Sequence, residues 1–152
     1  YTFQVGAFTG GLNPYSVRIE RGVPSLGALE IGDFVGVPRA IDPAPDGTAA
    51  TRHLEFVNEN ETHPATFHLH SLITEAGLPV WRGITCGGLH DYALPDLTAA
   101  GFPNWPPSGE RLIWTMYSID AVGDDYDQFT YRWLGATYRT GYAADAGFAT
   151  FP

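Results

Sequence analysis

A chain of 152 residues is long enough to form one domain with a substantial buried core. It carries 17 acidic residues against eight arginines and no lysine, a formal net charge of −9, which excludes nucleic acid and anionic membranes as expected partners. No apolar run approaches the roughly 20 residues of a transmembrane helix, and Cys86, the single cysteine, excludes an intrachain disulfide.

The start of the chain and one short motif bear on its localisation. The sequence opens at Tyr1 with neither a methionine nor a signal peptide, which is typical of a processed, mature protein, and we therefore expect secretion. The triplet Asn60-Glu61-Thr62 is a glycosylation sequon, so a glycan at Asn60 is expected if a eukaryote secretes the protein.

Apolar and polar residues alternate with a period of two in several windows, which is typical of half-buried β-strands. In chain order, the predicted strands are residues 2–7, 15–20, 33–37, 53–56, 66–72, 112–117 and 129–133. The 18 glycines, 12 prolines and 14% aromatic residues favour short strands joined by tight turns. We therefore predict an all-β sandwich or barrel in which residues 1–152 form a single domain.

Two connections between these strands stand out by composition. A long loop rich in proline and glycine is expected over residues 83–109, with one helical turn at 94–100. The acidic stretch 120–127 is predicted to be a hairpin turn, because it lacks the twelve-residue loop and closing glutamate of an EF-hand calcium site.

The tryptophans are expected to divide between the core and the surface. Trp114 and Trp133 fall on alternating strands, so we predict that both lie in the core. Trp81 and Trp105 lie among prolines in predicted loops, where they would serve exposed recognition or plug one end of the sandwich.

The strongest chemical signal is a pair of histidines on one predicted strand. His68 and His70 are two residues apart, so both imidazoles project from the same face, and Phe67 and Leu69 enter the opposite, packed side. Imidazole nitrogen suits copper, zinc, iron and nickel, and two parallel rings supply half of a four-coordinate shell. The alternative is a pair of structural histidines that binds no metal.

A third metal ligand would have to come from another part of the chain. His63 lies in a polar turn beside Pro64, where it is either solvated or turned in toward the pair. His90, in the predicted long loop, is the better candidate for a distant third ligand, and His53 is expected at the surface.

Several motifs follow one another in a recognisable order. They are Gly32-Asp33, a strand ending at Asn58, Phe67-His68-Leu69-His70, Pro107-Ser108-Gly109-Glu110, an aromatic strand at 129–133 and a glycine-rich run at 141–147. This order resembles the first cupredoxin domain of multicopper oxidases, the laccase-like enzymes. The resemblance implies a Greek-key, cupredoxin-like β-sandwich, and copper as the metal, because the His-x-His pair of that family helps to hold a trinuclear copper cluster.

The chain departs from this family at the remaining copper ligands. Arg132 and Leu134 stand near the place of the family's second histidine pair, and no histidine follows His90. Cys86 and His90 are only faintly similar to the loop that binds the type-1 copper, which needs two histidines and a cysteine. We therefore do not expect this chain by itself to reduce dioxygen.

A second resemblance concerns the cupins. His68, His70 and Glu75 have a spacing similar to the metal-binding motif of that family, and a 2-His-1-carboxylate set can hold Fe(II) with positions open for substrate and oxygen. Leu112 stands where the last cupin ligand belongs, and residues 74–77 are also consistent with a simple turn.

Taken with the missing ligands, the sequence favours a secreted, non-catalytic domain that acts as an accessory or interaction subunit of a larger oxidase, such as a two-chain laccase. Its partner would be another protein or a second copy of the chain. One alternative is a small metalloprotein or cupin-like oxidoreductase in which His68 and His70, completed by Glu75, His63 or His90, bind copper, iron or zinc. The other is a carbohydrate-binding module or virion surface protein.

Overall fold

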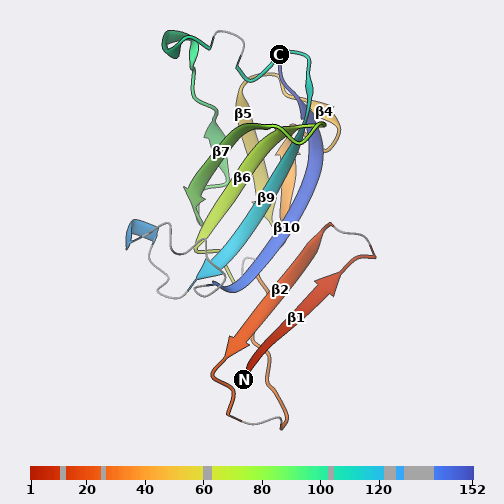
Figure 1. Ribbon diagram of the computed structural model, residues 1–152, viewed down its shortest axis with the longest axis vertical. Helices are drawn as coiled ribbons and strands as arrows, with labels where there is room; N and C mark the ends of the chain where they lie inside the picture. The colour runs from red at the N-terminus through yellow and green to blue at the C-terminus, as the bar shows by residue number, and fades with distance from the viewer. Residues whose placement is uncertain (11–12, 25–26, 60–62, 103–104, 122–125, 129–138) are drawn as a thin grey trace.

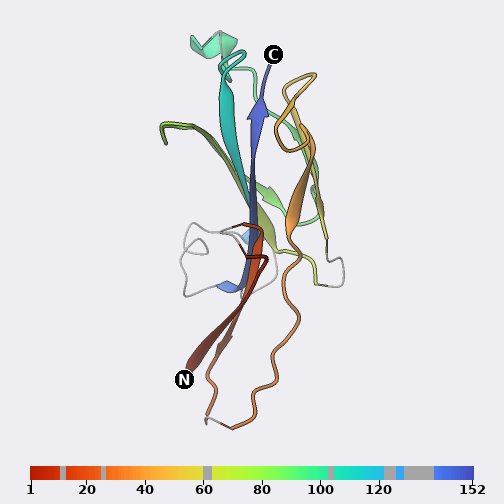
Figure 2. The same ribbon diagram turned by 90° about the vertical axis from the view of Figure 1, so that its right-hand side faces the viewer.

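The chain folds into two β-sheets that pack face to face as a sandwich (Figures 1 and 2). The computed structural model describes residues 1–10, 13–24, 27–59, 63–102, 105–121, 126–128 and 139–152. Within these ranges the helical segments are two short 3-10 turns, η1 (Thr98–Ala100) and η2 (Tyr126–Gln128). The predicted all-β sandwich is therefore confirmed. Among the residues described, no helix combines the length and the apolar character needed to cross a membrane.

The larger sheet has the order β1-β2-β10-β9-β6-β7, and neighbouring strands along this path are antiparallel. These strands are β1 (Thr2–Phe8), β2 (Tyr15–Arg21), β6 (Phe67–Thr74), β7 (Pro79–Cys86), β9 (Arg111–Ala121) and β10 (Arg139–Thr150). A two-residue strand, β4 (Gly47–Thr48), pairs in parallel with the end of β10. Because β2 and β10 are neighbours, segments from the two ends of the sequence lie in one sheet.

The smaller sheet has the order β3-β5-β8 and lies over one face of the larger sheet (Figure 2). Its strands are β3 (Pro38–Asp42), β5 (His53–Asn58) and β8 (Asp91–Ala93). Leu54 and Phe56 from β5 pack against Leu72, Trp114 and Phe151 from the larger sheet and its C-terminal end. Burial of these apolar side chains between the layers is the main driving force for the fold.

Side-chain alternation divides the larger sheet into two faces. The face toward the smaller sheet, here the inner face, carries Arg18, His68, His70, Leu72, Trp114 and Asp120. The opposite face, here the outer face, carries Tyr15, Leu69, Tyr117, Ile119 and Tyr142. Phe67 is fully buried on the outer face beside Ile119, so it packs on the side opposite the histidines, as predicted. The histidine face is buried as well.

Most of the predicted strands are present, with one clear exception. Strands occupy the predicted windows 2–7, 15–20, 53–56, 66–72 and 112–117. The prediction of a strand at 33–37 is wrong, because these residues pair with no strand and β3 begins only at Pro38. Val35 instead packs against the inner face, where its carbonyl accepts a hydrogen bond from Ser16 Oγ. The predicted strand at 129–133 lies outside the described residues.

The two predicted connections contain more strand than their composition indicated. The segment 83–109 includes the end of β7 and all of β8, and its helical turn is the three-residue η1. Asp120 belongs to β9 and is buried, so the acidic turn does not begin there, while residues 122–125 lie outside the described ranges. Alternation is a weak signal in these segments because glycine and charged residues interrupt it.

The predictions for the tryptophans have different outcomes, and the prediction of a loop at Trp81 is wrong. Trp114 is 2% exposed and lies in the core, whereas Trp133 is outside the described residues. Trp105 is buried in the same core cluster, and its Nε1 donates a hydrogen bond to the carbonyl of Val80, which fits the plugging role. Trp81 lies on β7 and stacks on Tyr92, so it is not on an exposed loop.

A glycine allows a charged contact to cross the central strand of the inner face. Gly141 on β10 pairs with Arg18 on one side and with Asp120 on the other. Because position 141 has no side chain, the Arg18 guanidinium passes over β10, and its Nη1 lies 3.2 Å from Asp120 Oδ2. A Cβ atom at position 141 would lie 2.9 Å from Val35 Cγ2. The local sequence thus makes room for the ion pair and for the covering segment.

This close packing predicts that Gly141→Ala destabilises the protein. The added methyl must displace Val35, and it also lies only 3.3 Å from the backbone carbonyl oxygen of Val17. Such overpacking costs roughly 1–3 kcal/mol. Urea unfolding monitored by tryptophan fluorescence measures the change. Gly88→Ala is the matched control, because a Cβ at position 88 meets nothing within 4 Å. Equal unfolding free energies for the two variants would contradict the steric role of position 141.

Candidate functional site

Three histidines converge on one phenylalanine inside the sandwich. His68 and His70 on β6 are both 0% exposed, and His90 lies just before β8. Their ring centroids lie 4.8, 4.9 and 5.4 Å from the ring centroid of Phe56, which comes from β5 in the smaller sheet. The structure therefore brings together three of the predicted metal ligands, with a phenyl ring packed against each of them.

His68 is hydrogen-bonded at both ring nitrogens. Its Nε2 lies 2.9 Å from the carbonyl oxygen of Gly87, which can only accept, so Nε2 carries the proton and donates. Its Nδ1 then accepts from the hydroxyl of Ser118, at 3.1 Å. This neutral tautomer leaves no lone pair on the ring available to a metal ion. A metal at His68 would have to displace one of these partners.

His70 is held mainly by ring packing. Its ring centroid lies 4.9 Å from that of Tyr92 and 6.2 Å from that of Trp114. Its Nε2 lies 3.5 Å from Thr85 Oγ1, a long contact, and its buried Nδ1 has no hydrogen-bond partner among the described residues. His70 is thus the one member of the pair whose ring keeps an uncommitted nitrogen.

Burial lowers the pKa of both imidazoles. The loss of solvation, only partly opposed by the hydrogen bond to Gly87, lowers the pKa of His68 to about 4. The pKa of His70 falls to about 3, again through burial and, to a smaller extent, through the neighbouring His68. Both rings are therefore neutral at neutral pH.

The remaining predicted ligands lie in other places. Glu75 is in the turn between β6 and β7, where its carboxylate accepts a hydrogen bond from Arg111 at 3.1 Å. His63 is hydrogen-bonded to Asp120, with 3.1 Å between Nε2 and Oδ2. In the described part of the chain, no group of three or more His, Cys, Asp or Glu side chains has a geometry suited to a metal ion. The copper, iron or zinc site stays a prediction, and we derive no chemistry from it.

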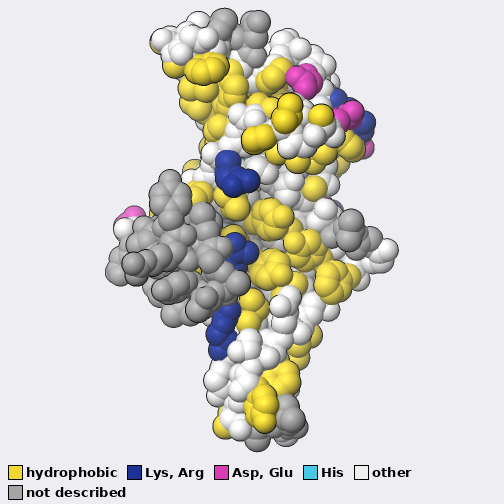
Figure 3. Space-filling model, in the orientation of Figure 1, with side chains coloured by type: hydrophobic (Ala, Val, Ile, Leu, Met, Phe, Trp, Pro, Cys, Tyr) yellow, Lys and Arg dark blue, Asp and Glu magenta, His cyan; other side chains and the backbone are white. Residues whose placement is uncertain are grey.

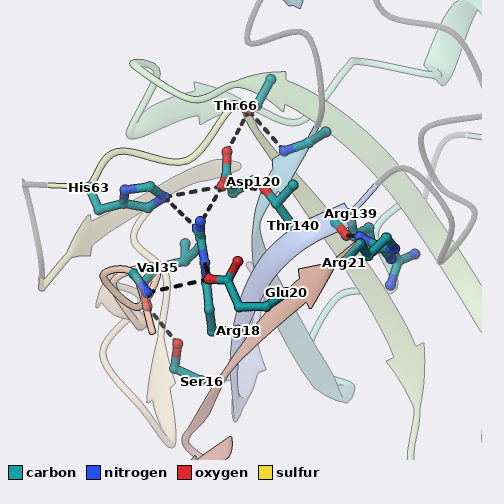
Figure 4. Close-up of polar contacts among 12 residues, drawn as sticks. Ser16, Arg18, Glu20, Arg21, Val35, His63, Thr66, Asp120, Arg139 and Thr140 are labelled. Atoms are coloured by element: carbon teal, nitrogen blue, oxygen red, sulfur yellow. Dashed lines mark hydrogen bonds and ion pairs between the residues drawn. The ribbon is translucent and has the colours of Figure 1, made fainter. Parts of the chain in front are cut away.

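Asp120 is the centre of a second polar cluster, which the sequence did not indicate (Figure 4). Its Oδ2 accepts hydrogen bonds from Arg18 Nη1, from His63 Nε2 and from the Thr140 hydroxyl, and its Oδ1 accepts from Thr66 Oγ1 at 3.3 Å. A pocket of about 290 Å³, lined in part by His63, Thr66 and Asp120, opens beside it. Because each carboxylate oxygen accepts hydrogen bonds from residues of other segments, this cluster holds β2, β9, β10 and the segment before β6 together.

The outer face carries a different kind of site. A pocket of about 400 Å³, which we call the tyrosine–arginine pocket, is lined by Tyr15, Leu69, Arg82, Tyr117, Ile119, Arg139 and Tyr142. In Figure 3, hydrophobic side chains gather in the middle of this view, with Arg side chains beside them. None of the described residues that line the pocket is acidic, although the chain as a whole has a net charge of −9.

The tyrosines of this pocket hold one another in place. The rings of Tyr15 and Tyr142 meet edge to face with 6.0 Å between their centroids, and the Arg139 guanidinium lies 5.8 Å from the Tyr142 ring centroid. Burial, and then the neighbouring hydroxyls of Tyr117 and Tyr142, raise the pKa of Tyr15 to about 12. The Tyr15 phenol is therefore a neutral hydrogen-bonding group. The tyrosine rings, with Leu69 and Ile119, lie next to the two guanidinium groups that line the pocket.

The sequence held a partial signal for this pocket. Tyr15 and Tyr117 each sit in a window of strict alternation, which predicts a strand but not which face remains open. Tyr142 lies in the glycine-rich run 141–147, and Arg139 lies just before it. The composition of this run did not indicate a strand or a pocket. The pocket forms because β2, β10 and β9 are neighbours in the sheet, and that order is not a local property of the sequence.

Comparison of the chain with models of protein families, with curated proteins and with solved structures gives no match. The resemblances to cupredoxins and cupins therefore stay predictions, and the function has to be argued from the two faces of the sheet.

The lowered pKa values of His68 and His70 predict a specific loss of stability in acid. Unfolding returns both imidazoles to the ordinary pKa of about 6.5, so below that pH the unfolded chain binds more protons than the folded one. Each histidine should then reduce the unfolding free energy by about 1.4 kcal/mol per pH unit as the pH falls toward about 4 for His68 and about 3 for His70. Above pH 6.5 both contributions are fully present.

Urea unfolding at several pH values between pH 7 and pH 5 measures the slope of the unfolding free energy against pH. In His68→Gln, which keeps a donor for the Gly87 carbonyl, the slope should fall by the contribution of one histidine. Leu78→Gln, a change at an exposed residue that carries no titratable group, should leave the slope unchanged. A slope that is the same in the wild type and in His68→Gln would show that burial of the imidazole does not control acid stability.

Proposed function

We propose that this protein is a non-catalytic interaction domain that binds an acidic segment of a protein partner in the tyrosine–arginine pocket. The observation that carries the proposal is the composition of the described part of the pocket lining: it includes three tyrosines and two arginines, and no carboxylate is among these described residues. Tyrosine and arginine are the side chains that most often dominate binding energy at protein interfaces.

Charge supports an acidic ligand. Most of the described arginines outside the pocket are matched by carboxylates: Arg18 with Asp120, Arg39 with Glu59, Arg52 with Asp96, and Arg111 with Asp46 and Glu75. Arg82 is exposed on β7 and makes no salt bridge with a described residue. An arginine beside an apolar floor attracts a carboxylate and can bind it through two parallel hydrogen bonds.

The polar groups of the interior support a non-catalytic role. The ring nitrogens of His68 and the carboxylate oxygens of Asp120 are occupied by hydrogen bonds within the protein. These groups stabilise the sandwich, whereas the tyrosine–arginine pocket opens on the outer face. That the partner is the catalytic chain of an oxidase, and that the protein is secreted, stay predictions.

Binding of a fluorescein-labelled peptide of glutamates flanking one tyrosine tests the proposal. Anisotropy titration should show saturable binding that weakens as salt is added, because the contact is partly electrostatic. Arg82→Glu should weaken binding at least about tenfold, equivalent to roughly 1.4 kcal/mol. Arg39→Glu, the same charge change on β3 in the other sheet, should bind like the wild type.

Two outcomes would overturn this function. The first is an affinity for the acidic peptide that Arg82→Glu and Arg39→Glu lower equally, because the effect would then follow net charge alone. The second is retention of neutral glycans by the wild type together with no binding of the acidic peptide, which would assign the tyrosines to sugar rings.

A further inference from the structure

Strand β1 forms an open edge of the larger sheet. All seven of its residues pair with β2, from Thr2 opposite Arg21 to Phe8 opposite Tyr15. On its other side no strand of the described chain pairs with it. Every second N–H and C=O group of an edge strand points away from its sheet, so β1 presents a row of such groups to solvent. Figure 1 shows β1 and β2 projecting together from the rest of the sheet.

The two edges of the sheet differ in a way that bears on pairing. β7, at the opposite edge, begins with Pro79 and carries Arg82 near its middle. Proline and charged side chains are the usual means by which an edge strand is protected from pairing with another chain. β1 has the sequence TFQVGAF, with no proline and no charge. The sequence of β1 therefore carries neither of these protections, and no described strand pairs with its free side.

The sequence of β1 is complementary to itself. Antiparallel pairing of two copies about a two-fold axis at Val5 places Phe3 opposite Ala7, Gln4 opposite Gly6 and Thr2 opposite Phe8. In each of these pairs a larger side chain faces a smaller one, and no charges oppose each other. Phe8 is 64% exposed in the single chain, so pairing also covers an apolar ring.

We propose that β1 of one copy pairs antiparallel with β1 of a second copy, so that two larger sheets join into one continuous sheet. The axis of such a pair is perpendicular to the sheet, so the outer faces of both copies lie on the same side. Gln4 and Phe8 already contact the tyrosines of the pocket, through the Tyr142 hydroxyl and the Tyr15 ring. The dimer thus presents two tyrosine–arginine pockets on one surface, suited to bivalent binding.

Sedimentation equilibrium of the whole chain tests this pairing. At concentrations up to roughly 100 μM, where an association in the micromolar range is well populated, the mass should approach twice the 16.5 kDa of one chain. Val5→Lys and Val5→Glu each place like charges opposite each other on the axis, so each variant alone should be monomeric. An equimolar mixture of the two should recover the dimer, which a merely misfolded arm would not do.

The binding of an acidic peptide and the pairing of β1 can be tested independently of each other. Arg82→Glu, which should weaken binding of the acidic peptide, lies on the far edge and should dimerise like the wild type. Val5→Lys should still bind the peptide as a monomer. A wild type that sediments as a single chain at all concentrations would overturn the pairing, and so would a dimer that survives in Val5→Lys. A mixture of the two Val5 variants that stays monomeric would also overturn it.

Discussion

The structure depends on one buried carboxylate, that of Asp120. Removal of a carboxylate from water costs several kcal/mol unless hydrogen bonds and an opposite charge replace the lost solvation. Here Arg18, His63, Thr66 and Thr140 replace it, and they come from β2, from the segment before β6 and from β10. Satisfying this one group therefore fixes the positions of segments that are far apart in the sequence. It also attaches the β1–β2 hairpin to the sandwich, because Arg18 reaches Asp120 across the strand between them.

The inner face changes from polar to apolar along its length. At one end lie the Asp120 cluster and the hydrogen-bonded His68, and at the other lie Leu72 and Trp114, which pack against the smaller sheet. His70 stands between the two regions, surrounded by aromatic rings. An imidazole suits this boundary because its ring packs like an aromatic residue, as the rings of His68 and His70 both do against Phe56. The nitrogens of His68 also bond to Ser118 and to the carbonyl of Gly87. The histidine pair thus has a structural reason to be where it is, whether or not an ion ever binds there.

No described strand packs over the tyrosines of the outer face, which is the face that we propose for recognition. The aromatic rings provide contact area at a small entropic cost, and the arginines provide direction and charge. The open edge of β1 borders the same face, through the contacts of Gln4 and Phe8 with Tyr142 and Tyr15. Ligand binding and self-pairing would therefore use adjacent parts of one surface. A partner that engages both pockets would gain affinity from the pairing without any additional contact.

The sequence by itself determined the local features of this protein. Alternation with a period of two is a property of neighbouring residues, so it identified the strands at 15–20, 66–72 and 112–117 and placed His68 and His70 on one face. It did not reveal that this face is the buried one, because burial depends on what packs over a strand. Only the tertiary structure decided that Arg18 meets Asp120 across Gly141, and that tyrosines from three strands share one pocket. Strand order depends on interactions between distant parts of the chain, and no local pattern encodes it.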